Sequence, residues 1–82
     1  MMQSLNIQNP VDLGDAIRAA RKRQGLRQTD LALVAGTGDR FIRDLERGKE
    51  TAQLGPTFRV LAALGISLLA DSPADVMASV DD

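Results

Sequence analysis

The residues of this chain that could carry chemistry are mostly basic, and they gather in the middle of the sequence. All ten lysines and arginines lie between Arg18 and Arg59, and only acidic charges follow Arg59. From Arg18 to Lys49 there are nine basic and four acidic residues, a local net charge of +5 in a chain of net charge −1. Guanidinium and ammonium groups bind phosphate oxygens, and a guanidinium also pairs bidentately with guanine O6 and N7. The cluster is compatible with a surface that binds nucleic acid. A charge cluster by itself, however, favours the alternative interpretation, a solvated face without a ligand.

Other kinds of chemistry lack the residues they need. The chain contains no cysteine and no histidine, which excludes disulfides, thiol chemistry and the usual zinc sites. No nucleophile stands beside a base in a recognisable pattern, so we expect no enzyme, no metal site and no cofactor. Asp12 and Asp15 follow a predicted helix start, where negative charge is simply stabilising.

Length and hydropathy indicate one small domain away from membranes. The 82 residues suffice for a modest core of aliphatic side chains, since Phe41 and Phe58 are the only aromatic residues. No apolar run approaches the roughly 20 residues of a membrane-spanning helix. Residues 1–10 lack the basic flank and apolar core of a signal peptide. We therefore expect a cytoplasmic protein without membrane contact.

Residues 28–47, QTDLALVAGTGDRFIRDLER, have the spacing of a helix-turn-helix unit. Ala32 supplies a small residue where two helices cross, and Gly36 tolerates the positive φ of a tight turn. Ile42 and Leu45 are the apolar residues that the second helix must bury. The spacing predicts helices over residues 28–35 and 39–46. Its coincidence with the basic cluster favours DNA binding over a solvated face.

Two more helices are predicted on either side of this unit. Asn9 followed by Pro10 is typical of a helix start, and Gly25 is typical of the end of that helix. Pro56 is expected to open the last of these helices, and Gly65 to end it. The residues of this last helix expected to face inward are Phe58, Val60, Leu61 and Leu64.

The ends of the chain are less regular. Residues 66–70, ISLLA, are too short and apolar for another surface helix and are predicted to form a strand. Residues 72–75 resemble a capping box, so residues 76–80 form either a short helix or part of a frayed acidic tail. We divide the chain into an N-terminal segment (1–9) with a possible short strand, a DNA-binding and dimerisation domain (10–70), and an acidic tail or short helix (71–82).

Residues 13–69 resemble the Cro/repressor-type helix-turn-helix (XRE) family, and within it the HipB-like antitoxins. The resemblance rests on the stretches LGDAIRAARKRQGLRQTDLALVAG, FIRDLERGK and LGPTFRVLAALGISL. It implies an all-α, lambda-repressor-like fold of four to five helices, with a short C-terminal strand that forms a β-ribbon between two protomers. It also implies a homodimer that binds a palindromic operator, represses its own operon and neutralises a HipA-like serine/threonine kinase toxin. The alternatives are a stand-alone regulator without a toxin and a pure protein-interaction module.

The resemblance also assigns contacts with double-stranded DNA. Gln28 corresponds to a glutamine that binds a phosphate and supports the recognition helix, and Thr29 beside it reaches a phosphate or a base edge. Arg40 and Arg43 read guanine or contact only phosphates. Arg47 and Lys49 contact the DNA backbone. The full set of expected DNA-binding residues is Arg27, Gln28, Thr29, Gly38, Asp39, Arg40, Arg43, Asp44, Arg47 and Lys49.

Two positions depart from the pattern of the family. Arg27 stands where the family usually has serine or threonine, which loses an N-cap worth about 1 kcal/mol and adds a candidate phosphate contact. Gly38 stands where the recognition helix usually begins with serine or lysine, so one side-chain contact is missing. Asp39 then lies near phosphates, which lowers affinity unless it accepts a hydrogen bond from a cytosine N4.

Two further sets of residues are expected to hold the protein together. In the family, an arginine like Arg21 on the first helix pairs with a glutamate like Glu46, and this ion pair clamps the helices. The isolated strand predicted near the C-terminus must pair its N–H and C=O groups with another strand. It pairs either with residues 5–7 or with its counterpart in a symmetry mate, and dimerisation in the family favours the latter. The expected dimer contacts are Ile66, Ser67, Leu68, Leu69 and Ala70.

Overall fold

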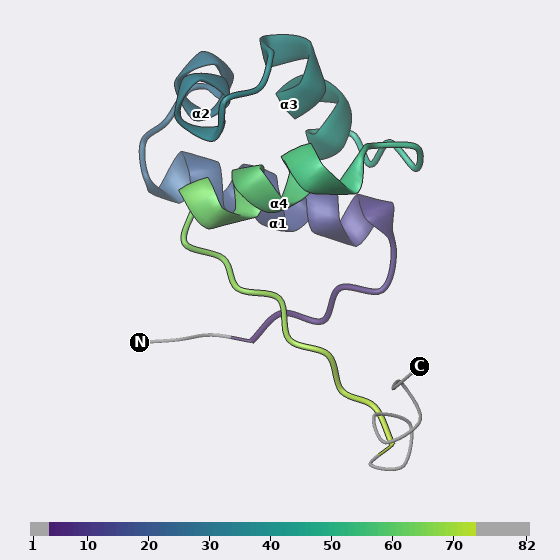
Figure 1. Ribbon diagram of the computed structural model, residues 1–82. Coiled ribbons are helices and arrows are strands. Elements are labelled where there is room, and N and C mark those ends of the chain that lie inside the picture. Colours follow the sequence, from purple (N-terminus) through teal and green to yellow (C-terminus); the bar gives the residue numbers. More distant parts are fainter. Residues whose placement is uncertain (1–3, 74–82) are drawn as a thin grey trace.

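The structure is a computed structural model that describes residues 4–73, and this part of the chain contains four helices (Figure 1). Helix α1 spans Pro10–Arg23, α2 spans Gln28–Ala35, α3 spans Asp39–Glu46 and α4 spans Leu54–Ala63. Helix α2 packs against α3 and α4, and α1 packs against α3. The all-α helix-turn-helix fold is thereby confirmed, together with the bounds predicted for α2 and α3.

The core lies where the four helices meet and consists of aliphatic side chains. Burying one such side chain stabilises the fold by about 1.5–3 kcal/mol. The largest side chains that are fully buried come from all four helices: Ile17, Leu31, Ile42, Val60 and Leu61. Leu64 is also buried, so three of the four inward positions predicted for α4 are confirmed.

Helix α1 has the boundaries that its caps predict. The side chain of Asn9 accepts a hydrogen bond from the backbone N–H of Asp12 at 2.9 Å, and Pro10 is the first helical residue. At the other end, Gly25 adopts φ +72°, and its N–H binds the carbonyl of Lys22 at 3.0 Å. These local bonds satisfy groups that a helix end leaves unpaired.

Helix α4 begins at Leu54, two residues before the predicted start at Pro56. The proline is tolerated at the third helical position because the first N–H groups of a helix have no intrahelical partner. The carbonyl of Gln53 accepts from both the N–H (3.2 Å) and the hydroxyl (2.6 Å) of Thr57, which secures the first turn. The inward prediction for Phe58 is wrong, because this residue is 51% exposed. The buried face of α4 follows Thr57, Val60, Leu61 and Leu64, and Phe58 lies about 110° of helix rotation from the centre of that face.

Residues 66–70 do not form a strand within the chain. Residues 66–73 have no regular secondary structure and run away from the helices (Figure 1). Within the described residues, no backbone hydrogen bond joins them to residues 5–7, so pairing with that segment is wrong for the single chain. The N–H of Ile66 instead binds the carbonyl of Leu61 at 2.9 Å and closes the turn after α4. Pairing between protomers stays a prediction, and the predicted helix over 76–80 lies outside the described residues.

Candidate nucleic-acid interface

The turn between α2 and α3 has the geometry that its sequence predicts. Gly36 adopts φ +72°, and the N–H of Thr37 binds the carbonyl of Ala32 at 2.9 Å. Ala32 is buried, with 2% of its surface exposed. A side chain at Gly36 would be strained by the backbone conformation itself, although the space around it is open. The α2–α3 pair is therefore held by a small residue at the helix contact and a glycine in the turn.

Helix α3 separates buried and exposed residues onto opposite faces. Ile42 and Leu45 point into the core, as predicted. The opposite face presents the exposed side chains of Asp39, Arg40 and Arg43. Arg47 and Lys49 continue this exposed basic surface just beyond the helix; we call Arg40, Arg43, Arg47 and Lys49 the α3 cations.

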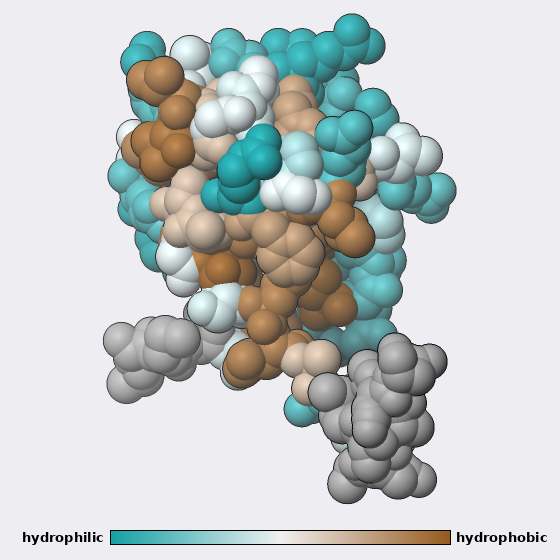
Figure 2. Space-filling view, in the orientation of Figure 1, coloured by the Kyte–Doolittle hydropathy of each residue, from teal (hydrophilic) through white to brown (hydrophobic). Residues whose placement is uncertain are grey.

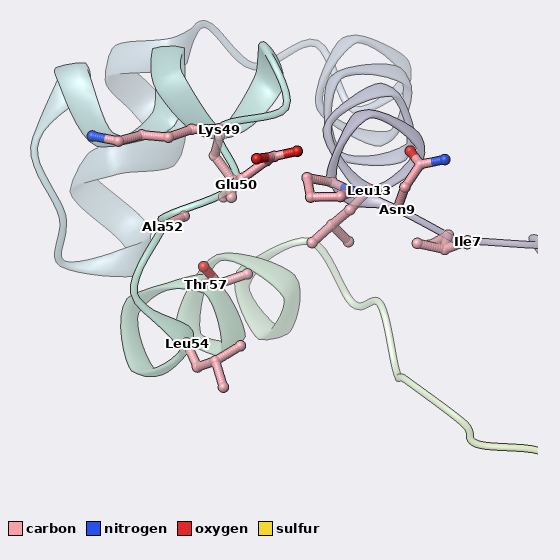
Figure 3. A pocket seen from close by; sticks show the side chains of 10 residues that line it. Ile7, Asn9, Leu13, Lys49, Glu50, Ala52, Leu54 and Thr57 are labelled. Atoms are coloured by element: carbon pink, nitrogen blue, oxygen red, sulfur yellow. The ribbon is translucent and has the colours of Figure 1, made fainter.

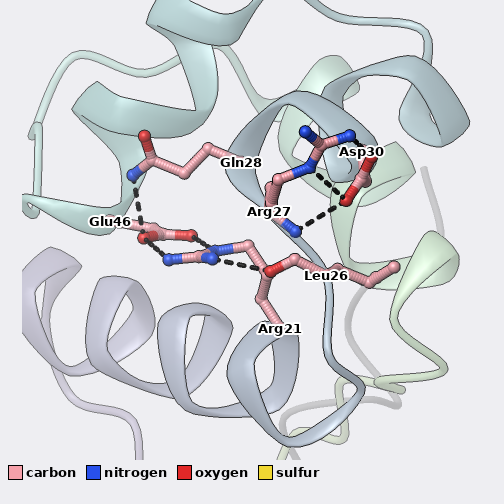
Figure 4. Close-up of polar contacts among 6 residues, drawn as sticks. All are labelled: Arg21, Leu26, Arg27, Gln28, Asp30 and Glu46. Carbon is pink, nitrogen blue, oxygen red and sulfur yellow. Dashed lines mark hydrogen bonds and ion pairs between the residues drawn. The ribbon is translucent and has the colours of Figure 1, made fainter.

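A buried ion pair fixes the orientation of α3 (Figure 4). Arg21 donates from Nε to Glu46 Oε2 at 2.6 Å and from a second guanidinium nitrogen to Oε1 at 3.0 Å. Its third nitrogen donates to the carbonyl of Leu26 at 2.8 Å. The hydrogen bond with Glu46 raises the pKa of Arg21 above its ordinary value. The side chains are only 10% and 4% exposed, so this predicted pair joins α1 to α3 away from solvent.

Gln28 is attached to the same carboxylate. Its Nε2 donates to Glu46 Oε1 at 3.1 Å, so Glu46 receives hydrogen bonds from both α1 and α2 (Figure 4). We call Arg21, Glu46 and Gln28 the clamp. An amide nitrogen carries two hydrogens, which leaves the second one of Gln28 available for another acceptor. The exposed side chain of Thr29 follows directly in the chain.

Arg27 lies at the start of α2 but does not cap it with its own side chain. Its backbone N–H donates to Asp30 Oδ2 at 2.8 Å, and its guanidinium pairs with the same carboxylate at 3.1 and 3.2 Å. These bonds lower the pKa of Asp30. Asp30 thus supplies half of a capping box, which sequence reasoning missed although an acid three residues after the N-cap is its signal.

Asp44 lies between two of the α3 cations. Its Oδ2 is 3.5 Å from Lys49 Nζ and 3.9 Å from Arg40 Nε. Within the described residues, Arg43 and Arg47 have no ion pair. The structure therefore brings Arg40, Asp44 and Lys49 together and leaves two arginines exposed beside them.

Two residues that position the helices were not predicted from the sequence. Gly14 lies where α1 crosses α3, and a Cβ there would be 2.5 Å from the carbonyl oxygen of Leu45. Its signal is an isolated glycine inside a helical pattern, which often marks close packing. Arg59 on α4 donates to the carbonyl of Ala35 at 3.2 Å, at the end of α2. A lone arginine on a helix carries no such signal.

Two features that would indicate another kind of site were not found in the described part of the chain. No helix in residues 4–73 is long and apolar enough to cross a membrane. No group of three or more metal-ligating side chains comes together in this part of the chain. Apolar residues instead gather on the face of α4 and the segment that follows, where Leu54, Phe58 and Leu68 are exposed (Figure 2).

Comparison with known proteins agrees with this geometry. Residues 17–70 match the sequence profile of the helix-turn-helix family. A protein of Sinorhizobium fredii named uncharacterized HTH-type transcriptional regulator y4mF is 55% identical over 62 residues, which cover 76% of this chain and 82% of that protein. The solved HipB-O4 20mer complex contains a chain with 27% identity and a TM-score of 0.76, over 85% of this chain and 100% of that one. A chain in the HipA-HipB-O2-O3 complex has the same identity, TM-score and coverage. The present chain belongs to the helix-turn-helix family, in its Cro/repressor (XRE) branch, and its fold is that of HipB.

Proposed function

We propose that this protein is a sequence-specific transcriptional repressor that binds a palindromic operator as a dimer in the cytoplasm. The observation that carries the proposal is the exposed row of α3 cations, which lie on α3 and in the turn after it, while the opposite face of α3 is clamped to α1 and α2. A rigid helix with an exposed basic face suits the major groove of DNA. A relative named as a transcriptional regulator and the HipB-O4 complex support this function.

In the proposed complex, the N-terminal part of α3 enters the major groove. Arg40 and Arg43 face the bases, where a bidentate contact with guanine contributes about 1–3 kcal/mol of discrimination. Arg47 then contacts phosphates on one side of the groove. Gln28 and Thr29, at the N-terminus of α2, contact phosphates on the other side, where free N–H groups also favour an anion.

Substitution of single arginines tests this assignment. Arg43→Ala should weaken binding to a duplex selected by the wild type from a random pool by about 1–3 kcal/mol, with little effect on random duplex. Arg47→Ala should weaken binding to both duplexes about equally, because a phosphate contact carries no base information. Fluorescence anisotropy over a salt series measures both. Unchanged affinity for every duplex after removal of both Arg40 and Arg43 would exclude α3 as the recognition helix.

The dimer is proposed to form through residues 66–70. These residues leave the helices without intrachain strand partners in the described part of the chain, and Leu68 and Leu69 are 47% and 92% exposed. Pairing with the same segment of a second protomer satisfies the backbone and presents two recognition helices about 34 Å apart, one turn of DNA.

Leu68→Pro should give monomers that lose the full operator, because proline removes a ladder N–H and the substitution removes an apolar contact. Asp71→Pro, just beyond the expected strand, is the matched control and should stay dimeric. Sedimentation and operator binding measure the two effects. A Leu68→Pro protein that stays dimeric with full affinity would place the interface elsewhere, with α4 as the next candidate.

We further propose that the protein is the antitoxin of a type II toxin–antitoxin pair and neutralises a HipA-like kinase. The HipA-HipB-O2-O3 complex supports this role. The proposed toxin surface is the apolar side formed by α4 and the segment after it. It includes a cavity of about 240 Å³ between the starts of α1 and α4, which Leu45 at the end of α3 and Lys49 also line (Figure 3). Ile7, Leu13 and Leu54 line this cavity.

Co-expression with the neighbouring reading frame tests the antitoxin role. The two products should co-purify and should form a ternary complex with operator DNA. A protein that runs alone at high concentration beside its neighbour's product, yet still binds the operator, would be a stand-alone regulator. A protein that binds the neighbour's product but no DNA would be a pure interaction module.

A further inference from the structure

The Asp44 side chain is partly buried, whereas the side chains of the cations that it contacts are more exposed. The Asp44 side chain is 26% exposed, against 88% for Arg40 and 51% for Lys49. One oxygen, Oδ2, lies within 4 Å of both cations, at 3.5 Å from Lys49 and 3.9 Å from Arg40. A phosphate oxygen approaching either cation must therefore compete with a carboxylate that is already there.

The turn after α3 keeps Lys49 close to this carboxylate. The backbone N–H groups of Arg47 and Lys49 both bind the carbonyl of Asp44 at 3.1 Å. Gly48 adopts φ +84° in this turn, and a Cβ there would lie 2.8 Å from Val11 Cγ2. The turn is therefore packed against α1, and its backbone hydrogen bonds hold Lys49 beside the last turn of α3.

The charge on this surface is smaller than its arginines suggest. Between residues 39 and 49, the charges of Asp39 and Asp44 offset part of the positive charge of the four α3 cations. The charge of Glu46 is compensated separately by Arg21 in the core. We propose that Asp44 determines specificity: it holds Arg40 and Lys49 back from phosphates and so limits affinity for DNA of random sequence. This inference rests on the proposed DNA binding and assigns Asp44 a role other than contact with a base.

The competition affects random and operator DNA differently. Binding to random DNA comes from neutralised phosphates, so a cation that stays on Asp44 is unavailable to the DNA backbone. A surface ion pair is weak, however, and a bidentate contact between arginine and guanine is stronger. Arg40 therefore leaves Asp44 when the right base is present and stays when it is absent.

The test compares Asp44→Asn with Asp15→Asn. Asp15 is an exposed acid on α1, so both variants change net charge equally, but only the first frees the α3 cations. Anisotropy titrations use a random-sequence duplex and the duplex selected by the wild type, over a salt series. Asp44→Asn should bind random duplex about threefold to tenfold more tightly. A plot of log binding constant against log salt concentration should become steeper by about 0.9 for each additional phosphate that the protein neutralises. The affinity for the selected duplex should rise less, so the specificity ratio falls.

Asp15→Asn should stay within about twofold of the wild type, since none of the ion pairs among residues 4–73 joins Asp15 to an α3 cation. Unchanged or weaker binding of random duplex by Asp44→Asn, or an equal increase in Asp15→Asn, overturns the inference. Asp44→Ser repeats the measurement with a second neutral side chain, and circular dichroism checks both folds. If the wild type binds no duplex in a salt-dependent way, the proposed function itself fails, which is a different result.

Discussion

Replacement of Glu46 by glutamine is the most direct test of the clamp. Glu46 accepts hydrogen bonds from two nitrogens of Arg21 and from Gln28, and its side chain is 4% exposed. Glu46→Gln leaves a buried guanidinium that cannot lose its proton, with only uncharged acceptors: the new amide oxygen and the carbonyl of Leu26. Breaking a buried ion pair in this way costs about 3–5 kcal/mol.

A loss of about 3–5 kcal/mol is a large fraction of the unfolding free energy of such a small domain. At about 0.05–0.15 kcal/mol per residue, an 82-residue chain has an unfolding free energy of about 4–12 kcal/mol. One kcal/mol shifts the Tm of such a domain by about 4–8 °C, so Glu46→Gln should lower Tm by at least about 12 °C. Urea unfolding followed by circular dichroism, at matched protein concentration, measures the free energy directly.

The double substitution Arg21→Met/Glu46→Met is the control. Buried pairs replaced by apolar side chains of similar volume are often neutral or more stable, because the desolvation of both charges is also removed. The double variant should therefore unfold at a higher urea concentration than Glu46→Gln alone. Equal losses in both, or a Glu46→Gln protein within about 1 kcal/mol of the wild type, would refute the view that the clamp is a desolvated ion pair.

Three further predictions follow from single contacts. Gly14→Ala should destabilise the fold by about 1–3 kcal/mol, since its Cβ would meet the Leu45 carbonyl, and a thermal melt with unchanged Tm would contradict this. The lowered pKa of Asp30, caused by Arg27, means a folded pKa below the unfolded value of about 3.9. The contribution of Asp30 to the unfolding free energy is then present above about pH 4 and is lost as pH falls through the lowered pKa. Asp30→Asn should therefore make the unfolding free energy depend less steeply on pH in that range. Arg59→Met should lower the unfolding free energy by about 1 kcal/mol, because the last carbonyl of α2 loses its donor, and equal urea midpoints would exclude that role.

The boundaries of α1, α2 and α3 could be predicted because each has a local cause. Asn9 supplies a side-chain acceptor, and Gly25 and Gly36 supply positive φ where a helix must end. The start of α4 could not be predicted in this way. Pro56 is compatible with several early positions of a helix, and the choice among them is made by Thr57 bonding to Gln53.

Contacts between distant parts of the chain were predicted only where the resemblance supplied them. The pairing of Arg21 with Glu46 came from the family, and the structure confirms it. An isolated glycine in a helical pattern signals close packing at Gly14, but which residues it meets depends on how two helices cross. The strand over residues 66–70 was expected from β-propensity, but propensity cannot supply a partner, and a single chain offers none in its described part.

The clamp has a consequence for how operator preference changes over generations. Arg21, Gln28 and Glu46 determine where α3 lies, and none of them belongs to the exposed α3 cations. Under the proposed function, mutations at Arg40 and Arg43 alter which sequence is read while the scaffold keeps its geometry. A duplicated gene can thus acquire a new operator through a few surface substitutions, without passing through unfolded intermediates.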